Sequence, residues 1–275
     1  MTHVTGVRRP LVLAVALGIA LGSWPAASLA APIPQPTGLA AANPAALLPA
    51  WDGSIDLYRD GVFTTQKTWL WCTAAGVQIV RNIVERDNDH STSGQRRYFD
   101  WMRSRNRYDL PESAGVDPQG WTAGLRHFVD DRYRLVASRS FGAGLRSAVA
   151  NLRRTGLPVA LTVANGGHGW ILTGFEATAD PILTDEFELR SVRVVGPLFG
   201  RQSKNGYDMP PDTKLSTERL RRFFTPWRYA PLPMVWDGKF VSIQPVLKDY
   251  EPPIAWVARA ARFAADLHAI RARSH

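Results

Sequence analysis

The single cysteine of the chain, Cys72, stands where its thiol would be reactive. Apolar residues recur after it at spacings of three and four up to Val84, and this periodicity predicts a helix with one buried face. Cys72 would then lie in the first turn, where unpaired N–H groups and partial positive charge favour the thiolate, the nucleophilic form. The pattern therefore indicates a nucleophile, against the alternative of a small buried core residue.

Two more side chains supply what a thiolate nucleophile requires. Gln66, six residues before Cys72, carries an amide that can donate hydrogen bonds to an oxyanion. His168 follows a glycine pair and opens a predicted strand, and an imidazole can carry a proton to a leaving amine. The alternative for His168 is a structural histidine in a turn. Together the three residue types indicate attack of a thiolate on a carbonyl carbon.

No metal or cofactor site is predicted. The sequence has neither a His-x3-His nor a Cys-x2-Cys spacing, and one cysteine with scattered histidines does not form a ligand set. It also has no phosphate-binding glycine loop and no nucleic-acid recognition motif. The other histidines belong to the leader, a polar loop, a helix face and the tail: His3, His90, His127, His268 and His275. His168 is therefore the histidine expected to pair with the thiol.

The residues around the cysteine resemble a known family. Gln66 and the stretch Trp71-Cys72-Thr73-Ala74-Ala75 resemble the start of the papain-like cysteine peptidases, closest to the bacterial C39-like branch. Gly167-His168 and Gly174-Phe175-Glu176 resemble the second motif of that family, and the resemblance covers about residues 60–230. It implies an α+β, papain-like fold with a helical half and an antiparallel sheet half. It also implies that Gln66 contributes to the oxyanion hole, Cys72 attacks and His168 is the base.

The resemblance breaks at the residue that orients the imidazole. The family has Asp or Asn at the end of the next strand, where this chain has Gly196. Four nearby side chains are candidates to replace it: Asp180, Asp185, Asn205 and Asp208. We predict a Cys–His dyad whose imidazole is held by a backbone carbonyl, a water or a side chain from outside the usual position. The alternatives are a catalytically impaired binding protein and a thiol-dependent acyltransferase.

The elements that must position these residues follow from periodicity and from turn residues. Helices are expected after Ser91, over residues 117–129 and 145–155, and over 215–224. Strands are expected over residues 133–137, 157–163, 168–175, 191–195 and 240–243. Trp69, Trp71 and Trp170 are neighbours of the candidate site residues, so each is expected either in a substrate groove or in the core. Asn165-Gly166-Gly167 predicts a tight turn directly before His168.

The chain divides into four parts. Residues 1–30 are predicted to be a secretory signal peptide, because two arginines precede an apolar run and Ser28 and Ala30 supply a small-residue cleavage site. A membrane anchor is the alternative, but Ser23-Trp24-Pro25 interrupts the run. Residues 31–50 are expected to be a Pro/Ala-rich linker, and the resemblance implies that residues 51–250 form the papain-like domain.

The last part, residues 251–275, is predicted to be an amphipathic helix. It is expected to dock on the domain or extend as a tail, with an anionic membrane surface as the alternative site. The whole chain has a net charge of +9, or +7 without the leader. This positive charge favours attraction of the protein to an acidic cell envelope. We therefore expect a secreted protein whose partner is a peptide or protein substrate, with no nucleic acid and no stable membrane span.

Overall fold

The computed structural model describes residues 51–201, 208–228 and 233–247. The leader, the linker and the C-terminal helix expected from the sequence lie outside these residues. The helices are α1 (Cys72–Glu85), α2 (Thr92–Arg103), α3 (Pro118–Phe128), α4 (Phe141–Thr155) and α5 (Thr217–Arg221). The strands are β1 (Ser54–Asp56), β2 (Tyr133–Ser138), β3 (Val159–Val163), β4 (His168–Ala177), β5 (Leu189–Val195), β6 (Thr213–Ser216) and β7 (Phe240–Pro245). The expected α+β class, which combines helices with an antiparallel sheet, is confirmed.

The strands form one sheet in the order β2-β7-β3-β4-β5-β6, and β1 pairs with β4. Every pair is antiparallel. The β3–β4 hairpin pairs Val163 with His168, and a short 3₁₀ turn (Ala164–Gly166) joins the two strands. Gly166 adopts a backbone φ of +89°, which residues other than glycine rarely adopt. The hairpin therefore fixes His168 as the first residue of β4.

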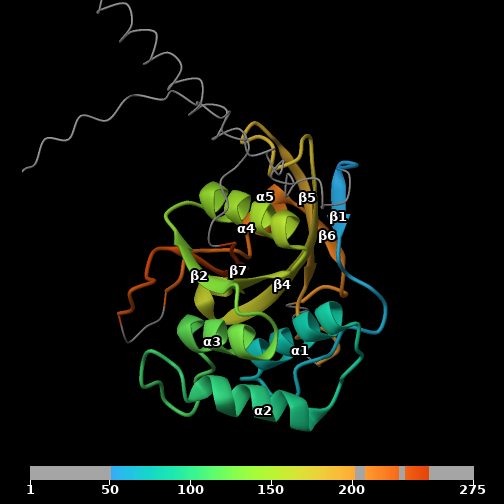
Figure 1. Cartoon of the computed structure of the whole chain (residues 1–275). Helices are drawn as coiled ribbons and strands as arrows, with labels where there is room; N and C mark the ends of the chain where they lie inside the picture. The colour runs from blue at the N-terminus through green and yellow to red at the C-terminus, as the bar shows by residue number, and fades with distance from the viewer. Residues whose placement is uncertain (1–50, 202–207, 229–232, 248–275) are drawn as a thin grey trace, which may run out of the picture. The chain divides into compact units, whose positions relative to one another are not determined.

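Helices cover both faces of the sheet (Figure 1). The strands β3, β4 and β7 are buried along nearly their whole length, on both sides. Trp170 and Leu172 pack in the core under α4, whereas Ile171 between them packs in the core formed with α1, α2 and α3. The same alternation holds along β3, where Ala160 faces the three-helix side and its neighbours face α4. Successive side chains of a strand point to opposite faces, so each central strand contributes to both cores.

The helix starts follow the capping residues in the sequence, with one exception. Ser91 caps α2, Asp117 caps α3 and Ser140 caps α4, each accepting a hydrogen bond from a backbone N–H in the first turn. The exception is α1, where Trp71 occupies the cap position and provides no side-chain hydrogen bond. The first turn of α1, which contains Cys72, therefore lacks a side-chain cap on its N–H groups.

One expected element is wrong. The helix predicted over residues 215–224 is limited to α5, because Leu215 belongs to strand β6, pairs with Val192 and is buried in the α4-side core. Burial and pairing in the sheet override the apolar spacing that suggested a longer helix. The helix begins only after Ser216, whose hydroxyl caps it. Within the described part of the chain, none of the helices has the length and apolar character needed to cross a bilayer.

Candidate active site

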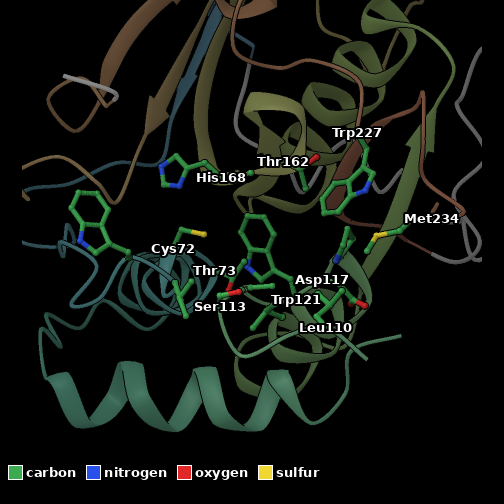
Figure 2. A pocket seen from close by; sticks show the side chains of 18 residues that line it. Cys72, Thr73, Leu110, Ser113, Asp117, Trp121, Thr162, His168, Trp227 and Met234 are labelled. Carbon is green, nitrogen blue, oxygen red and sulfur yellow. The ribbon is translucent and has the colours of Figure 1, made fainter. Parts of the chain in front are cut away.

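Cys72 and His168 come together although 96 positions separate them in the sequence. Cys72 is the first residue of α1, His168 is the first residue of β4, and both line the same cavity of about 240 Å³ (Figure 2). The Trp121 ring packs beside them: a Cβ added to Gly169 would lie 2.7 Å from it. This close approach of α3 and β4 requires a glycine after the histidine.

A carboxylate holds the imidazole. His168 Nε2 lies 2.9 Å from Asp208 Oδ2, and the Asp208 side chain is fully buried. The same carboxylate accepts hydrogen bonds from the indole N–H of Trp170 and from the backbone N–H of Leu198. Because Nε2 is taken by Asp208, Nδ1 is the ring nitrogen left for the interaction with Cys72 that helps to raise the pKa of His168.

The third position is filled from a different part of the chain. A Cβ added to Gly196 would lie 2.4–2.6 Å from the three carboxylate atoms of Asp208. The Asp208 carboxylate therefore occupies the space into which a side chain at position 196 would extend. The missing side chain at Gly196 and the buried carboxylate at Asp208 are two parts of one arrangement.

The other candidates for this position lie elsewhere or outside the described residues. Asp180 forms a buried ion pair with Arg153 at 2.9 Å. Asp185 belongs to the loop before β5, where its backbone carbonyl accepts a hydrogen bond from Arg146. Asn205 lies outside the described residues. The sequence did not choose among the four; the structure places Asp208 at the imidazole.

The surroundings of His168 favour its protonated form. Burial on its own lowers the pKa of an imidazole, but the hydrogen bonds to Asp208 and Cys72 outweigh it and raise the pKa of His168 from 6.5 to about 9. At neutral pH the ring is then an imidazolium beside the sulfur.

Gln66 lies in the loop immediately before α1 and is buried. Its side-chain amide donates a hydrogen bond to Thr68 O at 2.8 Å, and its backbone N–H donates to Pro197 O at 2.8 Å. Its Oε1 has no partner among the described residues. The amide thus donates within its own loop, and Gln66 is not among the residues that line the cavity shared by Cys72 and His168. Its role toward an oxyanion stays a prediction.

The cavity beside Cys72 is lined mainly by aromatic and apolar side chains (Figure 2). Sequence reasoning missed Trp121, Trp227 and Met234 as lining residues. The turn before His168 supports one of these walls, because a Cβ at Gly166 would lie 2.4 Å from the Trp227 ring. Asp117 also lines the cavity, and its carboxylate accepts backbone N–H groups from Gly120, Arg107 and Tyr108.

The three tryptophans singled out from the sequence divide between the groove and the core. Trp69 lines the cavity and is 58% exposed. Trp71 is buried against the helices, and Trp170 is buried in the α4-side core, where it donates to Asp208. Among the described residues, no group of three or more His, Cys, Asp or Glu side chains is arranged to hold a metal ion.

We compared the chain with protein-family models, with characterised proteins and with solved structures, and none of the three comparisons gave a match. The geometry of Cys72, His168 and Asp208 is therefore the basis for the function proposed below.

Proposed function

We propose that this protein is a secreted cysteine hydrolase with a papain-like fold, closest to the C39-like branch, and that it cleaves a peptide or amide bond. The observation that supports this most directly is the chain of contacts from Asp208 through His168 to Cys72, in which Asp208 and His168 are buried and Cys72 is partly exposed. Each side chain has the chemistry its position requires: a carboxylate orients the ring, the ring carries the proton, and the sulfur attacks.

The reaction follows from this order of contacts. The Cys72 thiolate attacks the substrate carbonyl carbon, a C–S bond forms and the carbonyl oxygen becomes an oxyanion. Collapse of this intermediate breaks the C–N bond, and His168 gives its proton to the leaving amine. His168 then takes a proton from a water molecule, whose oxygen attacks the thioester. The C–S bond breaks, the acid product leaves, and the thiolate and imidazolium are restored.

The oxyanion needs hydrogen-bond donors at the start of α1. The first turn of this helix has no side-chain cap, so its N–H groups and its partial positive charge are available to a developing negative charge. Gln66 would supply a second donor if its amide turned from Thr68 O toward the substrate. Removing one oxyanion donor costs about 10²–10³ in rate, so Gln66→Ala is expected to lose that much.

The cavity supports a peptide or similar chain as the substrate. Its volume of about 240 Å³ is below the roughly 300 Å³ at which pockets for whole small ligands begin, so it fits a single side chain of a longer substrate. Its walls are mainly aromatic and apolar, and the Asp117 carboxylate is already satisfied by backbone donors. A large uncharged side chain near the scissile bond is therefore favoured, because burying an unpaired charge there would be costly.

The same contacts bear on the two alternatives, a catalytically impaired binding protein and a thiol-dependent acyltransferase. A catalytically impaired binding protein was suggested by the absence of a carboxylate at Gly196, and Asp208 removes that reason. A thiol-dependent acyltransferase would share the acylation half of the reaction. It would differ only in passing the acyl group to an amine instead of water.

The proposal is tested by turnover of a peptide library with mature protein. Cys72→Ala and His168→Ala should each abolish product formation while the far-UV circular dichroism stays that of the wild type. Mass spectrometry of the products separates hydrolysis from acyl transfer to an added amine. Wild-type protein that binds peptides without converting any of them would contradict the hydrolase proposal and support the binding alternative.

A further inference from the structure

Two segments that are distant in sequence lie against each other beside Gln66. One is the loop of residues 65–69 before α1, and the other is the segment of residues 197–201 after β5. The backbone N–H of Gln66 donates to Pro197 O at 2.8 Å, and the Thr65 hydroxyl donates to Phe199 O at 2.9 Å. Position 66 is therefore fixed by contacts to a segment that follows Gly196 directly.

Arg201 makes the densest set of these contacts. Its Nη1 donates to the backbone carbonyls of Gln66, at 3.4 Å, and of Lys67. Its guanidinium lies 5.0 Å from the ring centroid of Trp69, within the range of a cation–π contact. One side chain thus contacts three of the six residues that lead into the Cys72 helix.

The other side of the loop is held by a buried glutamine of α2. Gln95 accepts a hydrogen bond from the Lys67 N–H at 2.9 Å and donates to Thr65 O at 3.1 Å. It also donates to Gln78 Oε1 at 2.9 Å, which ties the loop to α1. The loop is therefore clamped between Gln95, which is fully buried, and Arg201, which is partly exposed.

The segment that carries Arg201 also contacts the partner of the imidazole. The backbone N–H of Leu198 donates to Asp208 Oδ2, the same oxygen that lies 2.9 Å from His168. Residues 197–201 therefore join the carboxylate that orients His168 to the loop that carries Gln66.

We propose that Arg201 is a positioning residue for this site, acting through Gln66 to place the oxyanion donor. The inference depends on the proposed hydrolase function. An oxyanion donor is effective only when it lies about 2.7–3.1 Å from the oxygen it stabilises, so a small shift of the loop weakens it. Arg201 sets this distance by holding the carbonyls of Gln66 and Lys67, while taking no part in bond making itself.

The test uses mature protein and distinguishes an effect on oxyanion stabilisation from an effect on the reactivity of the Cys72 thiolate. Acylation by an activated ester forms an oxyanion, whereas alkylation of the thiolate by iodoacetamide occurs at a saturated carbon and forms none. Arg201→Ala should lower the single-turnover acylation rate by a factor of about 10 to 10², below the 10²–10³ expected for losing Gln66 itself. The iodoacetamide rate should stay within about twofold of the wild type.

A double variant shows whether the effect passes through Gln66. If it does, Arg201→Ala combined with Gln66→Ala should acylate no more slowly than Gln66→Ala alone, because coupled residues are not additive. Arg201→Lys should recover part of the rate, since an ammonium can still donate to both carbonyls. It also provides a folded variant should the alanine substitution unfold the protein.

Arg146 offers a matched control on the opposite side of the sheet. It too donates to two backbone carbonyls, of Asp185 and Phe187, and lies 4.5 Å from the centroid of the Phe187 ring. Arg146→Ala should leave both rates unchanged. Figure 1 shows its helix, α4, on the face away from α1.

Three results would overturn the inference. Additive losses in the double variant would mean that Arg201 does not act through Gln66. A parallel fall of alkylation and acylation in Arg201→Ala would mean that it acts on the thiolate or on the fold as a whole. Wild-type protein that is alkylated at Cys72 yet acylated by no ester would overturn the proposed function as well, and this outcome is distinct from the other two.

Discussion

Replacing Asp208 by asparagine tests the part of the site that the sequence left open. The carboxylate accepts three donors: Oδ2 accepts from His168 Nε2 and from the Leu198 N–H, and Oδ1 accepts from the Trp170 indole. An amide of the same shape offers one oxygen and one N–H₂ group. In either orientation at least one protein donor would face the new N–H₂ group, and the negative charge opposite the imidazolium would be lost.

Two magnitudes follow from these contacts. A buried donor left unsatisfied costs about 1–3 kcal/mol, so Asp208→Asn should lower the free energy of unfolding by about that amount. A hydrogen bond to a charged group contributes about 1.5–3 kcal/mol, which at 1.36 kcal/mol per tenfold predicts an acylation rate lower by a factor of about 10 to 10². This is less than the ~10⁴ known for the serine triad, because a cysteine is intrinsically the stronger nucleophile and depends less on its base.

The assay is single-turnover acylation by an activated ester across pH, together with urea unfolding. Asp208 raises the pKa of His168 against the lowering effect of burial, so in Asp208→Asn the alkaline limb of the pH–rate profile should move to lower pH. Asp180→Asn is the matched control, because Asp180 is also buried and paired, with Arg153. It should destabilise the fold while leaving the pH–rate profile in place.

A variant that keeps the wild-type rate and profile would refute the role assigned to Asp208. So would an equal shift of the alkaline limb in both aspartate variants, since that would trace the change to general destabilisation and not to the contact with His168.

Three further outcomes are expected. The acylation rate of the wild type should fall on the alkaline side near pH 9, because the imidazolium of His168 loses its proton as the pH rises through a pKa of about 9; a limb near 6.5 in the pH–rate profile would contradict this. Gly196→Ala should cost about 1–3 kcal/mol in urea unfolding and reduce acylation, because its Cβ would overlap the Asp208 carboxylate, whereas alanine at the exposed, unobstructed Gly142 should do neither. Mass spectrometry of exported protein should find an N-terminus within a few residues of Ala31, and a membrane-retained chain that begins at Met1 would exclude cleavage.

The sequence was informative where local rules decide the structure. Apolar spacing after Cys72 predicted α1, and Asp117 followed by a proline predicted the start of α3. The glycine turn before His168 predicted the β3–β4 hairpin, which the structure confirms. Each of these depends on residues within one or two turns of one another, so periodicity and capping chemistry suffice.

Asp208 could not be selected in this way, because its place depends on how the chain returns from the end of β5. It is 12 positions beyond Gly196, and no local pattern distinguishes it from the other acidic residues nearby. The one available signal was the absence of a side chain at Gly196. A glycine at a position where a side chain is expected implies that another group fills the space of that side chain. Trp121 and Trp227 were missed for the same reason, since burial can be expected of any tryptophan but a shared cavity cannot.

The central claim is that Cys72, activated by His168 and Asp208, forms a thioester with its substrate. The most direct measurement is intact-mass spectrometry of mature protein quenched in acid after brief exposure to an activated peptide ester at neutral pH. The account predicts one acyl group per molecule, located on Cys72, removed by hydroxylamine and absent from Cys72→Ala. Protein whose Cys72 reacts with iodoacetamide but never carries an acyl group would contradict it.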